Sequence, residues 1–233
     1  MAKKTHVTLS PIENVFPAWD GLTPDERQFV RSNFTAHTFK RNETVYSEGD
    51  VPSQMMLLAD GKLKVYKEGV GNRTQIIRIL KPGNTFGYRA IIANGSYNTN
   101  VMAIEPSVVY MLRTDIFLSI LQHNNALCYY YLRDLADDLG HSDSRTVNLT
   151  QKHIRGRLAE TLLLLKNDYG LEENNATINI YLSREDLANY SNMTTSNAIR
   201  TLGDFAEEHL IALDGKKIKI IDEEKLLKVS KSG

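Results

Sequence analysis

Cysteine is nearly absent from the sequence. Cys128 is the single cysteine among 233 residues, so the chain cannot form an intrachain disulfide. One thiolate cannot by itself hold an iron–sulfur cluster or a structural zinc ion. The composition therefore excludes the cysteine-based metal sensors, and we expect neither an iron–sulfur cluster nor any other metal site.

Long hydrophobic segments are also missing. No run of about 18 apolar residues occurs, which is the length that a membrane-spanning helix requires. The first residues, MAKKTHVTLSPIENVF, contain Lys3 and Lys4 but no apolar segment after them, so they lack the pattern of a secretory signal. We expect a cytoplasmic protein with no membrane partner.

The sequence lacks both net charge and catalytic motifs. Its formal net charge is +0 and 42% of its residues are hydrophobic, values typical of a globular protein of one or two domains. It contains no nucleophile–base set, no paired carboxylate motif, no phosphate-binding loop and no metal-ligand spacing. We therefore expect a binding or regulatory protein and not an enzyme.

Short alternating apolar segments separated by glycines dominate residues 38–113. Many short strands at nearly even spacing predict an antiparallel sandwich or barrel. Before them, Thr23, Pro24 and Glu26 stand in the order of N-cap, first helical residue and capping-box residue, which predicts a short helix. The strand segments are TVYSEGD, MMLLADGKLKVYKEG, TQIIRILKPGNTFGY and SVVYMLR.

A helical period replaces the strand pattern from residue 114 to about residue 148. Apolar residues recur at spacings of three or four and form a narrow seam of Cys128, Leu132, Leu135 and Leu139. Packing of this seam against the preceding sheet is one interpretation. We favour pairing with a second copy of the chain, because the helix continues past the length that a small sheet could cover. These four residues are the predicted dimer interface.

Residues 150–233 have the element order of a winged helix-turn-helix. The stretch IRGRLAETLLLLKNDYG predicts a helix that ends at Gly170, and ENNATINIYL predicts a short strand. Two helices follow, SREDLANYS with Ser183 as its N-cap and MTTSNAIRTLGDFAEEHL with Thr194 as its N-cap. Asp214-Gly215 then predicts the turn of a hairpin. We expect this segment to be a second domain.

The polar start of the second of these helices predicts contact with DNA. Thr194 caps the helix, Thr195, Ser196 and Asn197 fill its first turn, and Arg200 lies about one turn on, on the same side. In a helix-turn-helix the second helix enters the major groove, where Arg suits guanine and Asn suits adenine. An exposed capped helix that binds nothing is the alternative.

Residues around this helix complete the predicted interface. Ser183 and Arg184 begin the preceding helix, and the hairpin lysines Lys216 and Lys217 are expected to contact phosphates, with a solvated hairpin as the alternative. Charges from residue 150 on nearly balance, which a strong DNA binder seldom shows. Two local basic clusters soften this objection: Lys152, Arg155 and Arg157 precede the first helix of the domain, and the hairpin carries Lys216, Lys217 and Lys219. The residues expected to pack the two helices together are Leu187, Ala188, Ala198, Ile199 and Leu202.

Four motifs follow one another in a specific order: EGD at 48–50, DGKLKVY at 60–66, KPGNTFGY at 81–88 and SREDLANYSNMTTSNAIRTL at 183–202. With them, nearly the whole chain resembles the Crp/Fnr family of bacterial transcription regulators. The resemblance implies an α+β fold with three parts: a cyclic-nucleotide-binding-like β jelly roll as sensory domain (1–120), a dimerisation helix (121–149) and a winged helix-turn-helix DNA-binding domain (150–233).

The resemblance also implies how such a chain works. It implies a parallel homodimer on a two-fold symmetric operator in double-stranded DNA, with RNA polymerase as a candidate partner. Thr195, Ser196 and Arg200 occupy the positions that read bases in the family. The expected effector pocket consists of Phe86, Gly87, Tyr88, Arg89, Asn98 and Thr99.

The predicted pocket departs from the cyclic-nucleotide receptors of the family. Those receptors carry a Gly-Glu pair, whose Glu binds the ribose, and a later Arg that neutralises the cyclic phosphate. Here Tyr88 stands in place of the Glu and Asn98 in place of the Arg, which would leave a buried phosphate unpaired. Cyclic AMP is therefore not the expected effector, and a displaced charge from Arg89 is a minor alternative.

The identity of the effector stays open. Haem is a low-ranked candidate, because lone histidines are more often surface residues than ligands; the candidate ligands are His37, His123, His141 and His153. The preferred interpretation is a dimeric DNA-binding regulator that responds to an effector other than cyclic AMP. The alternative is a cyclic-nucleotide-binding regulatory module whose C-terminal domain acts through a protein partner.

Overall fold

The computed structural model describes residues 10–232. Residues 1–9 and 233 lie outside the described residues, and with them the two N-terminal lysines considered above. The chain divides into two compact units. The first unit contains the residues up to 67 together with 78–137, and the second contains 68–77 together with the chain from 138 on.

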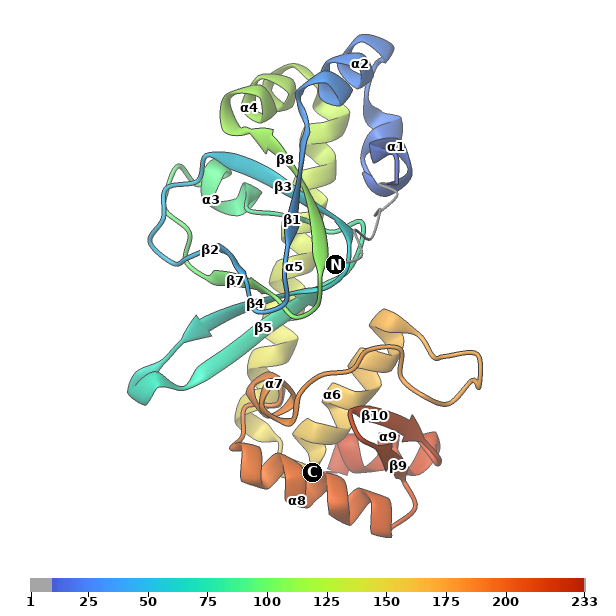
Figure 1. Ribbon diagram of the computed structural model, residues 1–233. Coiled ribbons are helices and arrows are strands. Elements are labelled where there is room, and N and C mark those ends of the chain that lie inside the picture. Colours follow the sequence, from blue (N-terminus) through green and yellow to red (C-terminus); the bar gives the residue numbers. More distant parts are fainter. Residues whose placement is uncertain (1–9, 233) are drawn as a thin grey trace, which may run out of the picture. The chain divides into compact units, whose positions relative to one another are not determined.

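The first unit is built around two four-stranded sheets, with the strand orders β1-β8-β3-β6 and β2-β7-β4-β5 (Figure 1). Gly61 joins β3 to β4 with a φ of +86°, and a Cβ added there would lie 2.5 Å from the Pro106 carbonyl oxygen, so the turn requires glycine. The two sheets confirm the predicted jelly roll. The strands are β1 (Thr35–Phe39), β2 (Thr44–Tyr46), β3 (Gln54–Asp60), β4 (Leu63–Glu68), β5 (Thr74–Leu80), β6 (Thr85–Phe86), β7 (Asn100–Ala103) and β8 (Ser107–Arg113).

Short helices lie at one end of these sheets (Figure 1). The helix after Thr23 begins as predicted: the Thr23 hydroxyl accepts a hydrogen bond from the Glu26 N–H (3.3 Å), and the Glu26 carboxylate accepts one from the Thr23 N–H (2.8 Å). Between β4 and β5 the chain forms a 3-10 turn, Val70–Asn72. The helices of the first unit are α1 (Ile12–Val15), a 3-10 helix (Trp19–Gly21), α2 (Pro24–Asn33), α3 (Tyr88–Ile92) and α4 (Thr114–His123).

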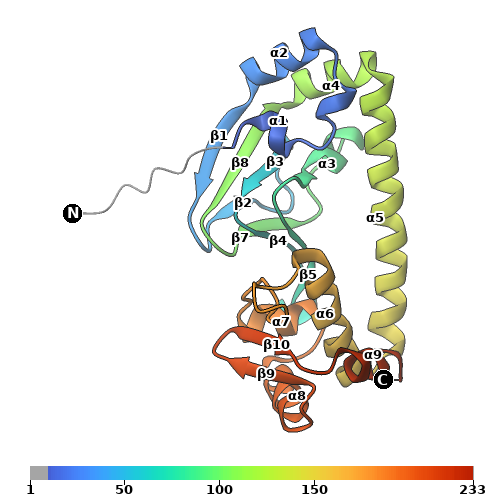
Figure 2. The same ribbon diagram turned by 90° about the vertical axis from the view of Figure 1, so that its right-hand side faces the viewer.

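The long helix predicted from residue 114 is in fact two helices, α4 and then α5 (Asn125–Gln151). Asn124 separates them, because its side chain accepts a hydrogen bond from the Leu127 N–H (2.8 Å) and donates to the Gly21 carbonyl oxygen (2.9 Å). An Asn that bonds in this way caps a new helix and ends the old one. From there α5 runs on as one continuous helix (Figure 2).

The second unit contains α6 (Ile154–Tyr169), α7 (Arg184–Tyr190), α8 (Thr195–Glu207), the hairpin β9 (Ile211–Asp214) and β10 (Lys217–Ile220), and α9 (Glu223–Ser232). This order confirms the predicted winged helix-turn-helix. The prediction of a strand in ENNATINIYL is wrong. Only isolated β-bridges form there, and they join Leu171 to Ile178 and Thr177 to Lys219. The cause is Asn174, whose side-chain oxygen accepts the N–H groups of Ala176 (3.0 Å) and Thr177 (2.9 Å) and so forms a turn.

Within the second unit, Arg145 of α5 holds residues 68–77 against the end of α7. Its Nη2 donates to the carbonyl oxygens of Ile76 (2.7 Å) and Tyr190 (2.8 Å), and the guanidinium lies 4.5 Å from the centroid of the Tyr190 ring. Gln75 adds a hydrogen bond to the Asn189 carbonyl oxygen (2.8 Å). Burial lowers the pKa of Arg145. These contacts explain why the end of the β4–β5 hairpin belongs to the second unit.

Candidate nucleic-acid interface and sensory pocket

Both helices of the helix-turn-helix begin with the predicted caps. The Ser183 hydroxyl accepts a hydrogen bond from the Asp186 N–H (3.0 Å) and donates to the Asp186 carboxylate (2.6 Å). The Thr194 hydroxyl accepts one from the Asn197 N–H (3.2 Å). Ser183 and Thr194 therefore stand where their side chains stabilise a helix end.

The first two turns of α8 present an exposed face. Thr195, Ser196 and Arg200 are all exposed, as the sequence predicts for residues that meet a partner. Asn197 is half-buried, and its side-chain oxygen accepts a hydrogen bond from Arg200 Nη2 (3.2 Å). Asn197 therefore orients Arg200 in the free protein. The buried face of α8 consists of Ala198, Thr201, Leu202 and Phe205.

Ile199 does not lie where the sequence predicts. We expected it to pack between α7 and α8, but its side chain is 53% exposed, whereas Ala198 and Leu202 beside it are buried. The helical period explains the difference. Residue 199 follows 195 by four positions and 196 by three, so it faces the same side as these exposed polar residues.

Arg184 is used to hold the wing. It is the first residue of α7, and its Nη2 donates to the Gly215 carbonyl oxygen in the β9–β10 turn (2.7 Å). Burial lowers its pKa. Arg184 thus fixes the position of the hairpin relative to α7, while its assignment as a DNA contact stays a prediction.

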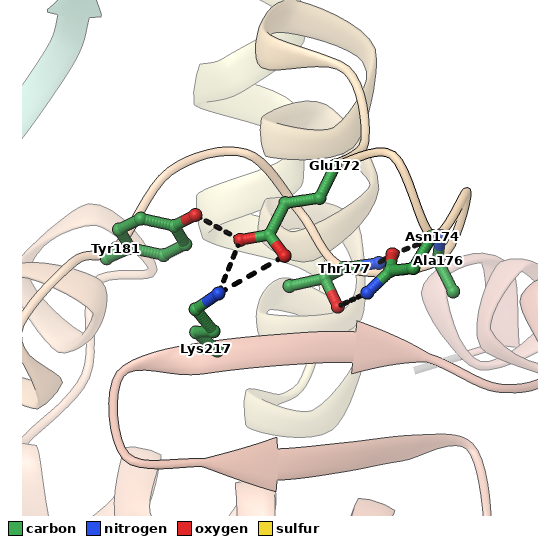
Figure 3. A network of polar contacts seen from close by, with 6 residues as sticks. All are labelled: Glu172, Asn174, Ala176, Thr177, Tyr181 and Lys217. Carbon is green, nitrogen blue, oxygen red and sulfur yellow. Dashed lines mark hydrogen bonds and ion pairs between the residues drawn. The ribbon is translucent and has the colours of Figure 1, made fainter.

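The three lysines of the wing differ in their surroundings. Lys216 and Lys219 are exposed, and no ion pair of theirs is found within residues 10–232. Lys217 Nζ instead lies 2.9 Å and 3.2 Å from the two carboxylate oxygens of Glu172, which also accepts a hydrogen bond from the Tyr181 hydroxyl (Figure 3). The hydrogen bond to Glu172 raises the pKa of Lys217, and the bonds from Tyr181 and then Lys217 lower the pKa of Glu172.

The predicted basic cluster around the start of α6 bonds within the second unit. Lys152 pairs with Glu160, and Arg155 Nη2 lies 2.8 Å from a carboxylate oxygen of Glu208. Arg157 donates to backbone carbonyl oxygens of the turn that leads from α7 to α8, at 3.1 Å. These three residues therefore stabilise the fold of the helix-turn-helix. The expectation that their positive charge compensates for the nearly neutral net charge of the domain is corrected, because the charges are bonded within the domain.

The predicted dimer seam is partly exposed. Cys128 is exposed, and Leu132 and Leu139 are 62% and 64% exposed. Leu135 is half-buried and packs against the apolar core of the first unit. Two leucines of a single helix thus remain uncovered in one copy of the chain, and the assignment of the seam as an interface stays a prediction.

The predicted effector pocket is distributed over two cores. Phe86 is buried in the apolar cluster between the sheets, with Tyr97, and Tyr97 stacks on Tyr46 at a centroid separation of 3.7 Å. Tyr88 belongs to the other cluster, where it packs 4.8 Å from the Tyr131 ring. Gly87 lies between them with a φ of +79°. The residues before and after Gly87 therefore pack into different apolar clusters.

The polar residues of this pocket do not replace the missing nucleotide ligands. The Tyr88 side chain is fully buried, and its hydroxyl donates to the Asp134 carboxylate of α5. Arg89 and Asn98 are exposed, and Thr99 is half-buried near Tyr46. Burial raises the pKa of Tyr46, although Thr99 and nearby positive charge oppose the effect. The Tyr88 hydroxyl is therefore already bonded within the first unit, and the assignment of these residues as an effector pocket stays a prediction.

The candidate haem ligands lie on separate elements. His37 is on β1, His123 ends α4, His141 is on α5 and His153 caps α6, and all four side chains are exposed. Within residues 10–232 no group of three or more His, Cys, Asp or Glu side chains could hold a metal ion. No helix in this part of the chain is long and apolar enough to cross a bilayer.

Comparison with known proteins agrees with both units. Residues 36–124 match the family described as cyclic nucleotide-binding domain, and residues 156–229 match the Crp-like helix-turn-helix domain. A CRP-like cAMP-activated global transcriptional regulator of Mycobacterium tuberculosis is 24% identical, over 89% of this chain and 93% of its own. A global nitrogen regulator of Nostoc sp. is 25% identical, over 83% of this chain and 89% of its own.

Solved structures show the same fold. The structure of FixK2 from Bradyrhizobium japonicum has a TM-score of 0.77 and 19% identity, and the match covers 86% of this chain and 98% of that chain. The relatives named here are regulators, in line with the expectation that the chain is not an enzyme. Two domain matches in the order implied by the motifs, together with relatives aligned over most of their length, show that the chain belongs to the Crp/Fnr family of transcription regulators.

Proposed function

We propose that the protein is a homodimeric regulator that reads a two-fold symmetric DNA site through the first turns of α8. The observation that carries the proposal is the exposed face of Thr195, Ser196 and Arg200 on a helix whose opposite face is buried. Short polar side chains let a helix approach base edges, and Arg is the commonest reader of guanine. Lys216, exposed in the wing, adds a phosphate contact that positions the domain.

A pair of charge-matched variants tests this reading. Arg200→Ala should weaken binding to a selected palindromic duplex by about 1–3 kcal/mol and relax the preference for one base pair in each half-site. Arg41→Ala removes the same charge from an exposed residue of the first unit and should change neither quantity. Equal effects of the two substitutions, measured by fluorescence anisotropy, would show that Arg200 contributes only charge.

We propose that α5 forms the dimer through Cys128, Leu132 and Leu139. Exposed leucines at heptad spacing are a pairing seam that one copy of the chain cannot cover. Leu139→Asp should give monomers in sedimentation and lower affinity for the two-half-site duplex by at least about 100-fold, since the two half-sites are then bound independently. Leu227→Asp, at another helix position with 43% exposure, is the control and should remain dimeric.

The direction of pairing has its own test. In a parallel dimer the two Cys128 side chains face each other, so mild oxidation should produce a cross-linked dimer that Cys128→Ser abolishes. An antiparallel pairing would separate the two thiols along the helix, and no cross-link would form.

We further propose that the effector is not cyclic AMP. Tyr88 and Asn98 replace the two ligands of the nucleotide, and Tyr88 is already bonded to Asp134. Calorimetric titration with cyclic AMP should therefore give no binding heat up to millimolar nucleotide. Saturable binding at micromolar concentration would overturn the proposal.

A further inference from the structure

Ile199 is an exposed apolar side chain in the middle of the proposed DNA-reading face. More than half of it, 53%, is in contact with solvent, so this residue supplies only about half of the hydrophobic stabilisation that a fully buried isoleucine gives to a fold. Its neighbours on the face, Ser196 and Arg200, are both polar and exposed. The interior of the second unit therefore does not account for an isoleucine at this position.

Gly203 is a second residue of the same face that the interior does not require. It follows Ile199 by four positions, and a Cβ added to it would meet no atom within 4 Å. Glycine inside a helix costs roughly 1 kcal/mol relative to alanine, and here no close contact or positive φ within the unit compensates for it. The missing side chain of Gly203 instead leaves space on the surface of α8 that a closely approaching partner could occupy.

The chemistry of the major groove identifies the group that suits Ile199. Base edges in the groove present hydrogen-bond donors and acceptors, and the thymine C5-methyl is the apolar exception. An isoleucine against a donor or acceptor would leave that group unpaired and desolvated, which is unfavourable. Against a methyl it makes only favourable contacts, and its β-branched side chain loses little freedom in doing so.

Resting on the proposed reading of DNA by α8, we propose that Ile199 is a specificity residue that recognises the C5-methyl of one thymine in each half-site. Arg200 follows it directly in the helix, so this thymine belongs to a base pair next to the one that Arg200 reads. Gly203 leaves room for the helix to sit close to the DNA over the same face.

Deoxyuridine substitution isolates the methyl group. The probe is a duplex selected by the wild-type protein from a randomised library, in which each thymine of a half-site is replaced in turn by deoxyuridine. At one position the wild-type protein should lose about fourfold in affinity, the factor that corresponds to one buried methyl-sized group. Ile199→Ala should bind the thymine and deoxyuridine duplexes equally well, and Ile199→Val should retain most of the difference.

Ile221→Ala is the matched control, because Ile221 is 50% exposed and lies outside α8. It should keep the wild-type response to deoxyuridine, and thermal unfolding should show all three variants folded. A wild-type protein that is indifferent to every deoxyuridine, or an Ile199→Ala variant that keeps the full response, would overturn the proposal while leaving DNA reading by α8 intact. Failure to enrich any sequence from the library would overturn both.

Discussion

Two regions of the molecule are predicted to meet ligands, the start of α8 and the segment 86–99, and they are built in opposite ways. On α8, Thr195, Ser196 and Arg200 face solvent, and the bond between Arg200 and Asn197 lies within the same helix. In the sensory segment, Phe86 and Tyr88 are buried in apolar cores. The proposed DNA-reading surface leaves its side chains uncovered, whereas Phe86 and Tyr88 of the predicted pocket are packed into the protein's own cores.

The largest expected effect comes from making one type of substitution in both regions. Tyr88→Ala should lower the free energy of unfolding by about 3–5 kcal/mol, because it removes a fully buried ring and leaves a cavity. Ser196→Ala should change it by less than about 0.5 kcal/mol, since the residue is exposed. Urea unfolding followed by circular dichroism measures both. Similar changes in the free energy of unfolding for the two variants would contradict the contrast between a buried segment and an exposed helix face.

The ionisation of a buried tyrosine tests the filled region in a second way. Burial raises the pKa of Tyr131, the neighbour of Tyr88. A raised pKa means that this phenol stabilises the fold fully below the unfolded-state pKa of about 10, and that the contribution is lost as pH rises toward the folded-state pKa. Tyr131→Phe should therefore reduce the loss of stability above pH 10 by about 1.4 kcal/mol per pH unit. Other buried tyrosines keep part of the slope, and an unchanged slope would show that Tyr131 ionises while folded.

A smaller effect concerns the one wing lysine that already has a partner. Glu172→Gln should release Lys217 from its ion pair and make DNA affinity fall more steeply with salt, by about one additional phosphate contact. Glu173→Gln makes the same charge change at an exposed neighbouring residue and serves as the control. If both variants give the same salt dependence, the change follows from net charge alone, and the ion pair with Glu172 does not keep Lys217 from contacting phosphates.

Local signals in the sequence predicted much of the fold. The caps Thr23, Ser183 and Thr194 act on residues three positions away, so their role is visible in the chain itself. Asn124 caps α5 by the same local rule, through the Leu127 N–H, but its contacts with Gly21 and Glu26 join residues about a hundred positions apart, and no local pattern reveals these contacts. The strand expected at 173–182 does not form, because the Asn174 side chain accepts hydrogen bonds from the N–H groups of Ala176 and Thr177. The alternation of apolar residues gives no sign of this competing turn.

The candidate site was predictable to a lesser extent. The outward direction of Thr195, Ser196 and Arg200 follows from the helical period. Ile199 was assigned to the interior because it is apolar, but its position on the helix faces outward. The partner of Lys217 lies 45 residues earlier in the chain, so the pairing of this wing lysine depends on the tertiary fold and could not be read from the sequence.

The most direct measurement is the sequence of the DNA that the wild-type protein selects from a randomised library. Reading by α8 in a symmetric dimer predicts an inverted repeat whose half-site centres lie about 10–10.5 base pairs, or a multiple of this, apart. Each half-site should contain a G·C base pair next to an A·T base pair. An enriched pool with a single half-site or a direct repeat, or a pool without any consensus, would contradict dimeric reading by this helix.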